Sequence, residues 1–179
     1  MLKGKNHFSF LDIQPTKSLL ENPLEGLTKI DRTFWVSDAN NYNPINAKKD
    51  EGPPHLILDN LTNTIWHSKH SNTNDGKGQQ NSGGPFWFII DLKMATKIRG
   101  FEYVPRGEGA NGLFKDFKFY IGNSISEIEE KVGTERFLTS GQWNYNSDTG
   151  VHSEIHRVRL DQEVECSCIA LWSTGFCDS

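Results

Sequence analysis

Two short segments of the sequence carry side chains whose types and spacing suit the binding of a sugar. Trp66, His67 and His70 lie within TIWHSKH, and Arg106 and Asn111 lie within RGEGAN. A guanidinium only donates hydrogen bonds, whereas an imidazole and an amide can donate and accept, so together they match the hydroxyl groups of a sugar. An aromatic ring can cover the C–H face of a sugar and remove apolar area from water. The pattern predicts a carbohydrate-binding site.

Each of these residues also has an ordinary structural interpretation. Trp66 stands at the end of a predicted strand, where a tryptophan commonly fills a core. His67 taken alone is typical of a hydrogen-bonded structural histidine, and Arg106 could pair with a nearby glutamate at the surface, which would contribute little. Asn111 precedes a glycine, which is a common turn signal. The binding interpretation therefore depends on the whole group and its spacing.

The elements that must position these residues are predicted to be short strands between polar turns. FWFIIDL at 86–92 is a nearly continuous apolar run, and 114–122 alternates between apolar and polar side chains. Further strands are predicted at 32–39, 98–105, 136–143, 152–160 and 166–173, with a strand at the start of 55–70 and a helical turn or irregular edge at 124–133. About eight strands and no substantial amphipathic helix predict an all-β fold, an antiparallel β-sandwich of jelly-roll type.

Length and charge limit the organisation and the partners. A chain of 179 residues is long enough for one domain, so we expect residues 1–31 to form an N-terminal lead-in or linker and 32–179 to form the domain. The net charge of −4 argues against a nucleic acid or an anionic membrane as the main partner. No run approaches the roughly 18 apolar residues of a membrane span, so no membrane insertion is expected.

The three cysteines lie late in the chain. Cys166 and Cys168 are two positions apart, so on a regular strand they face the same side and are poorly placed to bond each other. A bridge from one of them to Cys177 and three free, mostly buried thiols both remain open. A zinc site that combines these cysteines with His67 and His70 is not expected, because H-x-x-H and C-x-C are not the paired spacings of structural zinc sites.

The order of several short motifs resembles the coagulation factor 5/8 type C, or discoidin, domain. These motifs are WVS at 35–37, LDN at 58–60, TIWHS at 64–68, the strand that ends at Leu92, YVPR at 103–106 and KDFKFY at 115–120. The resemblance covers roughly residues 32–176, and within that superfamily the chain is most similar to the family 32 carbohydrate-binding modules. It implies a galactose-binding-domain-like sandwich that binds a glycan through loops at one end.

The resemblance also implies roles for individual residues. In galactose-binding members, the sugar is held by a histidine directly after the tryptophan, by an arginine after a middle strand, and by an asparagine five positions later. The matching residues are His67, Arg106 and Asn111, and His70 stands where an aromatic often lies. A further aromatic in the C-terminal loop is expected, and Trp172 and Phe176 are both candidates.

The resemblance extends to the ligand, the location and a metal ion. It implies galactose or N-acetylgalactosamine glycans, an extracellular or cell-surface location, and a monomeric module of a larger protein. Members often hold a structural calcium beside an aspartate–threonine turn, which Asp59 and Thr64 match. Asn60 and Leu61 stand where a glycine and an acidic or amide residue are usual, so backbone carbonyls would have to complete that site.

Two other functions compete with glycan binding. A jelly-roll polysaccharide lyase or glycosidase needs two converging acid–base groups, and no spacing of Asp and Glu singles out such a pair, so we expect no enzyme. Lipid binding would need apolar spikes with a basic rim, whereas the loops are rich in Asn and Gly. Adhesion to a protein or a cell is the alternative that remains, because the end of a sandwich can bind any partner of suitable shape.

Overall fold

The computed structural model describes residues 7–13, 22–40, 42, 51–61, 64–67, 85–105, 113–143 and 155–174. The elements in chain order are β1 (His7–Ile13), β2 (Leu27–Lys29), β3 (Val36–Ala39), β4 (Glu51–Gly52), the 3₁₀ helix η1 (Pro54–Ile57), β5 (Ile65–Trp66), β6 (Phe86–Val104), β7 (Asp116–Gly122), α1 (Ile125–Lys131), β8 (Thr139–Gln142) and β9 (His156–Ser173). No helix in this part of the chain is long and apolar enough to cross a membrane.

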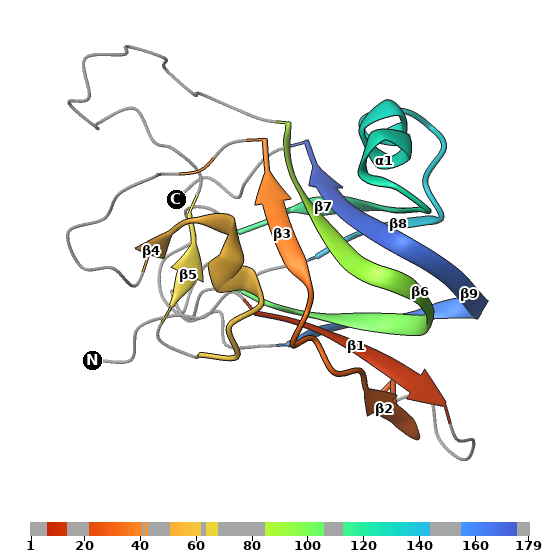
Figure 1. Cartoon of the computed structure of the whole chain (residues 1–179). Helices are drawn as coiled ribbons and strands as arrows, with labels where there is room; N and C mark the ends of the chain where they lie inside the picture. Colours follow the sequence, from red (N-terminus) through yellow and green to blue (C-terminus); the bar gives the residue numbers. More distant parts are fainter. Residues whose placement is uncertain are drawn as a thin grey trace, which may run out of the picture.

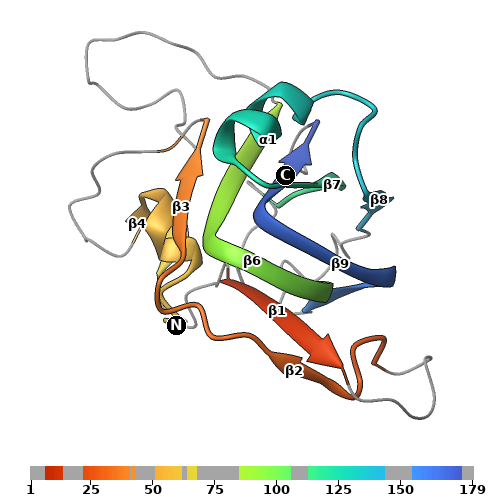
Figure 2. The same ribbon diagram turned by 45° about the vertical axis from the view of Figure 1, so that its right-hand side comes forward.

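Two long antiparallel strands, β6 and β9, run through both layers of a β-sandwich and bend sharply on the way (Figures 1 and 2). In the first layer, Phe86–Asp91 of β6 and Cys168–Ser173 of β9 pair with each other and continue to β3 on one side and to β7 and β8 on the other. In the second layer, 96–104 of β6 and 156–166 of β9 pair, and β1 and β2 extend the layer. The all-β antiparallel sandwich is confirmed.

The bend in β6 is produced by an irregular corner at Lys93. The backbone N–H of Lys93 donates to Asp91 Oδ1 at 2.8 Å, and Lys93 has a φ of 67°, in the left-handed region that few non-glycine residues adopt. Asp91–Thr96 therefore opposes only the shorter stretch Cys166–Cys168 of β9. Strands commonly pass from one sheet to another through such bulges. The two strands predicted at 86–92 and 98–105 are consequently one bent strand.

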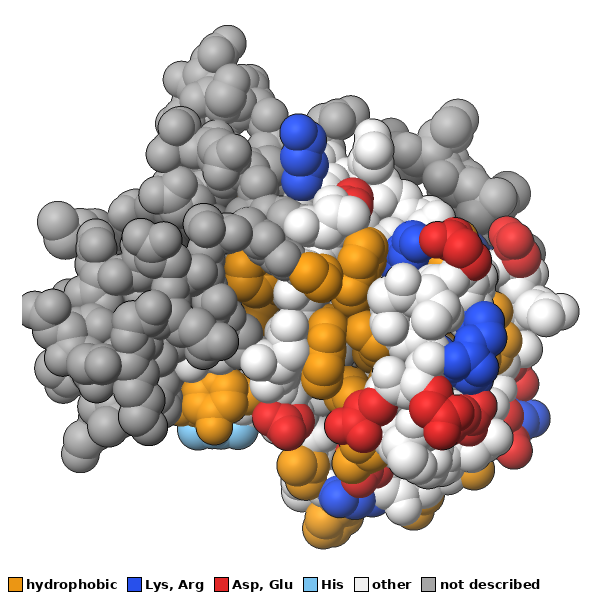
Figure 3. Space-filling model, turned by 90° about the horizontal axis from the view of Figure 1, so that it is seen from above, with side chains coloured by type: hydrophobic (Ala, Val, Ile, Leu, Met, Phe, Trp, Pro, Cys, Tyr) orange, Lys and Arg blue, Asp and Glu red, His pale blue; other side chains and the backbone are white. Residues whose placement is uncertain are grey.

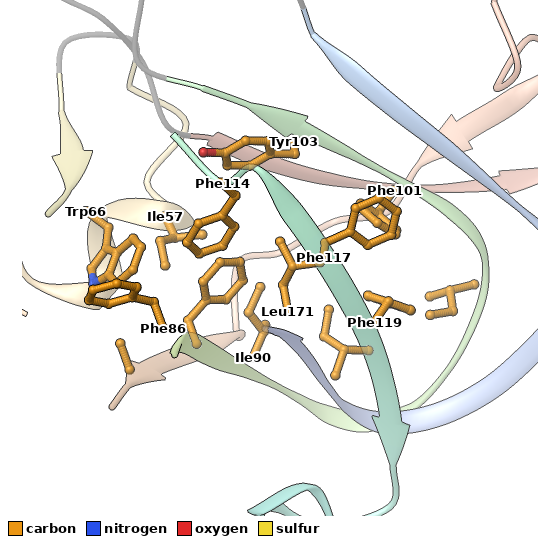
Figure 4. Close-up of a cluster of buried hydrophobic side chains, with 14 of the residues drawn as sticks. Ile57, Trp66, Phe86, Ile90, Phe101, Tyr103, Phe114, Phe117, Phe119 and Leu171 are labelled. Atoms are coloured by element: carbon orange, nitrogen blue, oxygen red, sulfur yellow. The ribbon is translucent and has the colours of Figure 1, made fainter. Parts of the chain in front are cut away.

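The hydrophobic core lies between the two layers. Alternate side chains of β6, β7 and β9 point into it, with Phe88 and Ile90 on β6, Phe119 on β7 and Leu171 on β9 among them (Figure 4). The opposite face of the first layer carries a smaller cluster beneath α1, formed by Ile89, Tyr120, Ile128, Cys168 and Ala170. Alternate side chains of the same strands therefore point to opposite faces of the first layer, and each set packs in its own cluster.

One predicted strand is wrong. Residues 55–58 form no strand, because Pro54–Ile57 is the 3₁₀ helix η1, with the Leu58 N–H donating to the His55 carbonyl at 3.1 Å. Pro54 begins this helix, and its fixed φ favours the first helical position while its missing N–H costs the helix nothing there. The run predicted at 124–133 does contain a helix, α1, whose first turn is capped by the Ser124 side chain accepting from the Glu127 N–H at 3.2 Å.

The two described cysteines are free and pack in two different clusters. Cys166 packs in the core between the layers, whereas Cys168 packs beneath α1. The expectation that they share one face is wrong, because the corner of the sandwich falls between them. Burial raises the pKa of Cys166 to about 12 and that of Cys168 to about 11. Cys177 lies outside the described residues.

Part of the expected lead-in joins the second layer. Residues 7–10 of β1 pair with 101–104 of β6, and β2 pairs with β1. Leu24 is only 3% exposed, and Arg159 Nη1 donates to the Pro23 carbonyl at 2.9 Å. The division of the chain at residue 31 stays a prediction, but strands on both sides of that point share one sheet.

A buried carboxylate links this N-terminal part to both long strands. Glu102 on β6 is 7% exposed and accepts from Arg157 Nε on β9 at 3.0 Å, while its other oxygen lies 3.1 Å from Lys29 Nζ on β2. Burial lowers the pKa of Arg32, and the charges of Asp59 and Glu102 oppose that shift. The carboxylate therefore balances positive charge from two parts of the chain, Lys29 and Arg32 in the N-terminal part and Arg157 on β9.

Replacing this carboxylate tests how strongly the N-terminal strands are held. Glu102→Gln is expected to lower the free energy of unfolding by about 1–3 kcal/mol, because the half-buried Arg157 and the exposed Lys29 lose a charged acceptor. Chemical denaturation measures the effect. The matched control Glu129→Gln changes an exposed helix residue and is expected to leave the unfolding free energy within about 0.5 kcal/mol of the parent. Equal effects of the two changes would contradict the role assigned to Glu102.

The raised thiol pKa values predict slow chemical labelling. In a Cys177→Ser background, a thiol-reactive dye at pH 8 should label neither remaining cysteine while the protein is folded, because little thiolate forms at pKa values of about 11 and 12 and both thiols are buried. Denaturant should release both. Mass spectrometry counts the labels, and fast labelling of the folded protein would contradict the packing described for these strands.

Candidate functional site

Several strand ends meet at one end of the first layer. Phe86, the first residue of β6, faces Ser173, the last residue of β9, and Asp116, the first residue of β7, faces Gln142, the last residue of β8. The connections 106–112, 144–154 and 175–179 are attached at or beside these positions. We call this the loop end of the sandwich. The corner of β6 at Lys93 lies away from it (Figures 1 and 2).

His67 follows directly on a short parallel strand pair. Gly52 of β4 faces Trp66 of β5, and the His67 N–H donates to the Gly52 carbonyl at 3.1 Å. Trp66 is 4% exposed and meets Phe88 and Phe114 edge-on, each at a centroid distance of 5.9 Å. The core interpretation of Trp66 is confirmed. This packing fixes the backbone from which the half-buried His67 side chain extends.

A continuous stack of rings lies beneath the loop end. Trp143 stacks on Tyr103 at 4.7 Å, on Phe117 at 4.6 Å and on His156 at 4.9 Å, and Tyr103 stacks on Phe114 at 5.7 Å. We call these five residues the aromatic floor. Such stacked pairs add about 0.5–1.5 kcal/mol each beyond the area they bury. The floor therefore forms a rigid base beside the residues at which the connections 106–112 and 144–154 begin and end.

The aromatic floor was not predicted from the sequence. A signal for it exists, because its members flank the two polar connections. Tyr103 and Phe114 stand on either side of 106–112, and Trp143 and His156 stand on either side of 144–154. Rings at both ends of a polar loop indicate that the loop is attached to a core rather than to an open edge.

Four of the predicted sugar-binding residues lie outside the described residues. These are His70, Arg106, Asn111 and Phe176. Their convergence on His67 stays a prediction. The nearest described residues are Pro105, directly after β6, Leu113, directly before Phe114 of the aromatic floor, and Thr174, directly after β9.

Trp172 lies within β9, which contains the strand predicted at 166–173, so it is not in the C-terminal loop where the resemblance places a binding aromatic. It faces Trp87 of β6 and Lys118 of β7 across the sheet, with Lys118 Nζ 5.3 Å from the centre of its ring. The half-buried indole packs against the cluster beneath α1. Of the two aromatic candidates, Phe176 is the one that follows the end of the strand. The role of Trp172 in binding stays a prediction.

Asp59 and Thr64, the predicted calcium ligands, do lie together. Thr64 Oγ1 donates to Asp59 Oδ2 at 2.7 Å, and the Leu61 N–H donates to Asp59 Oδ1 at 2.9 Å, with Asn60 at a φ of 62°. They supply one carboxylate and one hydroxyl of the six to eight oxygens that calcium prefers. In the described parts of the chain, no group of three His, Cys, Asp or Glu side chains could hold a metal ion. Backbone carbonyls and water would have to complete a calcium site.

An open groove of about 990 Å³ lies at the corner of β6, away from the loop end. Residues 30–35 and 92–97 supply most of its lining, and Phe34 beside it is 77% exposed. None of the predicted sugar-binding residues lines this groove. Seen from above, the described surface carries a central strip of hydrophobic side chains with acidic and basic ones around it (Figure 3). On this face the acidic and basic side chains of the described residues are interspersed.

Solved structures with this fold include carbohydrate-binding modules. CpGH89CBM32-5 from Clostridium perfringens, solved in complex with GalNAc-β-1,3-galactose, is 18% identical, with a TM-score of 0.57 over 79% of this chain and 85% of that chain. The family 32 module of NanJ from C. perfringens, in complex with galactose, is 19% identical, with a TM-score of 0.55 over 79% and 83%. The C-terminal domain of a chitobiase from Bacteroides fragilis is 20% identical, with a TM-score of 0.58 over 81% and 84%.

The sequence also matches a family model. The model of the F5/8 type C domain matches residues 36–175, from the first residue of β3 to just beyond the end of β9. This range contains both long strands, the aromatic floor and every residue of the candidate site except the last, Phe176. The protein therefore belongs to the F5/8 type C domain family.

Proposed function

We propose that this chain is a non-catalytic carbohydrate-binding module for glycans that end in galactose or N-acetylgalactosamine. The observation that carries the proposal is that His67, Arg106 and Asn111 all stand next to, or between, residues that pack in or against the aromatic floor. His67 follows the core residue Trp66, whose ring meets Phe114 of the aromatic floor, and Arg106 and Asn111 belong to the connection between Tyr103 and Phe114 of that floor. The galactose-containing ligands of the two C. perfringens modules support the choice of sugar.

The chemistry of these side chains suits galactose. The axial 4-hydroxyl leaves one face of the sugar ring as a patch of C–H groups, which an aromatic such as Phe176 can cover. The 3- and 4-hydroxyls can accept from Arg106 and exchange hydrogen bonds with His67 and Asn111. A hydrogen bond from a guanidinium contributes on the order of 1.5–3 kcal/mol before the losses of binding.

A site of this size binds weakly. One stacked ring and a few hydrogen bonds must offset the lost freedom of the sugar and of the loops that hold it, so a dissociation constant of about 1 mM is expected. Useful avidity comes from several copies or from neighbouring domains. An extracellular or cell-surface location within a larger glycan-processing or surface protein follows from the same proposal.

Titration with sugars tests the proposal. Galactose, N-acetylgalactosamine and lactose are expected to produce saturable NMR shifts, and glucose is not, because its equatorial 4-hydroxyl removes the contact that selects galactose. Arg106→Ala should abolish the shifts. Arg136→Ala, which changes an exposed arginine next to α1, is the matched control and should leave them intact. No shift in the parent protein with any sugar at about 50 mM would contradict the proposal, since even a millimolar site would be filled.

Calcium is the second testable part of the proposal. Asp59 and Thr64 already lie in contact, so a calcium ion at this turn would add stability with little rearrangement. The nearby charge of Arg32 opposes a cation and keeps the affinity low. Calcium at about 5 mM exceeds the dissociation constants of even weak extracellular calcium sites, so it should raise the melting temperature. Asp59→Asn should remove the rise. Equal melting temperatures in calcium and in EDTA would exclude the calcium site.

A further inference from the structure

Asp116, the first residue of β7, holds the end of β9 through three hydrogen bonds. Ser173 Oγ and the Thr174 N–H both donate to Asp116 Oδ1, at 2.8 Å and 3.0 Å, and Thr174 Oγ1 donates to Asp116 Oδ2 at 2.7 Å. Ser173 is fully buried. A carboxylate only accepts, so it can satisfy all three donors at once.

These bonds stand where the backbone ladder between β7 and β9 has ended. The last paired residues are Lys118 and Trp172, and continuing that register would bring Phe117 opposite Ser173 and then Asp116 opposite Thr174. The side chain of Asp116 therefore replaces the ladder at its final step. Without it, the Thr174 N–H and two hydroxyls would need other acceptors.

The start of β7 is also hydrogen-bonded to the end of β8, where the connection 144–154 begins. The Trp143 N–H donates to the carbonyl of Lys115, the residue before Asp116, at 2.9 Å, and Asp116 itself pairs with Gln142. Asn111 lies five positions before Asp116, and Phe176 lies two positions after Thr174. One carboxylate is thus bonded directly at the attachment points of the segments that carry these two candidate sugar contacts.

We propose that Asp116 is a positioning residue that couples the Arg106–Asn111 connection to the segment carrying Phe176, so that both contact one sugar together. This inference rests on the function proposed above. Binding is weakened when loops must be ordered at the moment of contact, and fixing their attachment points beforehand removes part of that cost. Asp116 performs this task from beneath the site, through Ser173 and Thr174, without touching the sugar itself.

A double-mutant cycle separates positioning from simple stabilisation. Asp116→Ala is expected to weaken galactose binding about 5- to 30-fold in the parent, and less than about 2-fold in a Phe176→Ala background, where the contact that it positions is already gone. Asp116→Asn keeps one acceptor oxygen and should lose less affinity than Asp116→Ala. It also tests the inference if the alanine variant folds poorly. Asp161→Ala, at an exposed position on β9, is the matched control and should bind as the parent does.

A second measurement needs no sugar. Hydrogen exchange of the Thr174 amide should be slow in the parent and faster in both Asp116 variants, because that N–H donates to the carboxylate. Unchanged Thr174 exchange in Asp116→Ala would overturn the inference, as would an equal loss of affinity with and without Phe176. Absence of sugar binding by the parent would instead overturn the proposed function, so the two failures can be told apart.

Discussion

The antiparallel ladder between β6 and β9 is the interaction on which the rest of the structure depends. Both strands enter both layers, so their pairing holds the sandwich together as well as each sheet. The layers can face each other only because β6 turns at Lys93, where the Asp91 carboxylate accepts the Lys93 N–H and the backbone takes a positive φ. The other strands of the large sheet are added beside β6 (β1, β2 and β3) or beside β9 (β7 and β8), while β4 and β5 form a separate two-stranded sheet.

The candidate site follows from the way the chain leaves this ladder. Tyr103 and His156 face each other at the last pair of the second layer, and Phe86 and Ser173 face each other at the last pair of the first. The polar connections begin at these ends, above rings that are stacked and largely buried. A rigid base beneath variable polar segments is the usual arrangement of a binding site on a sandwich. The scaffold therefore explains why residues far apart in sequence are attached near one another.

The sequence predicted the elements whose pattern is local. The apolar run at 86–92 and the alternation at 114–122 indicate strands because burial on one or both faces leaves a direct trace in residue type. Asp59 and Thr64 form the expected turn because an Asx side chain bonds its own backbone nearby. In each of these cases, the information needed lies within a few residues.

The features that sequence reasoning missed depend on distant contacts. Nothing near Cys166 or Cys168 indicates that a corner separates them, because the corner is set by the facing stretch of β6. The pairing of β1 with β6 joins segments about ninety residues apart, and short strands with such distant partners have a weak local signal.

The sharing of β6 and β9 by both layers also has a mechanical consequence. In a sandwich made of two separate sheets, a pulling force can slide one sheet over the other by disrupting side-chain packing alone. Here β6 and β9 continue from one layer into the other, so the layers cannot part unless these two strands unfold. The two layers are therefore joined by continuous backbone as well as by the packing of their side chains.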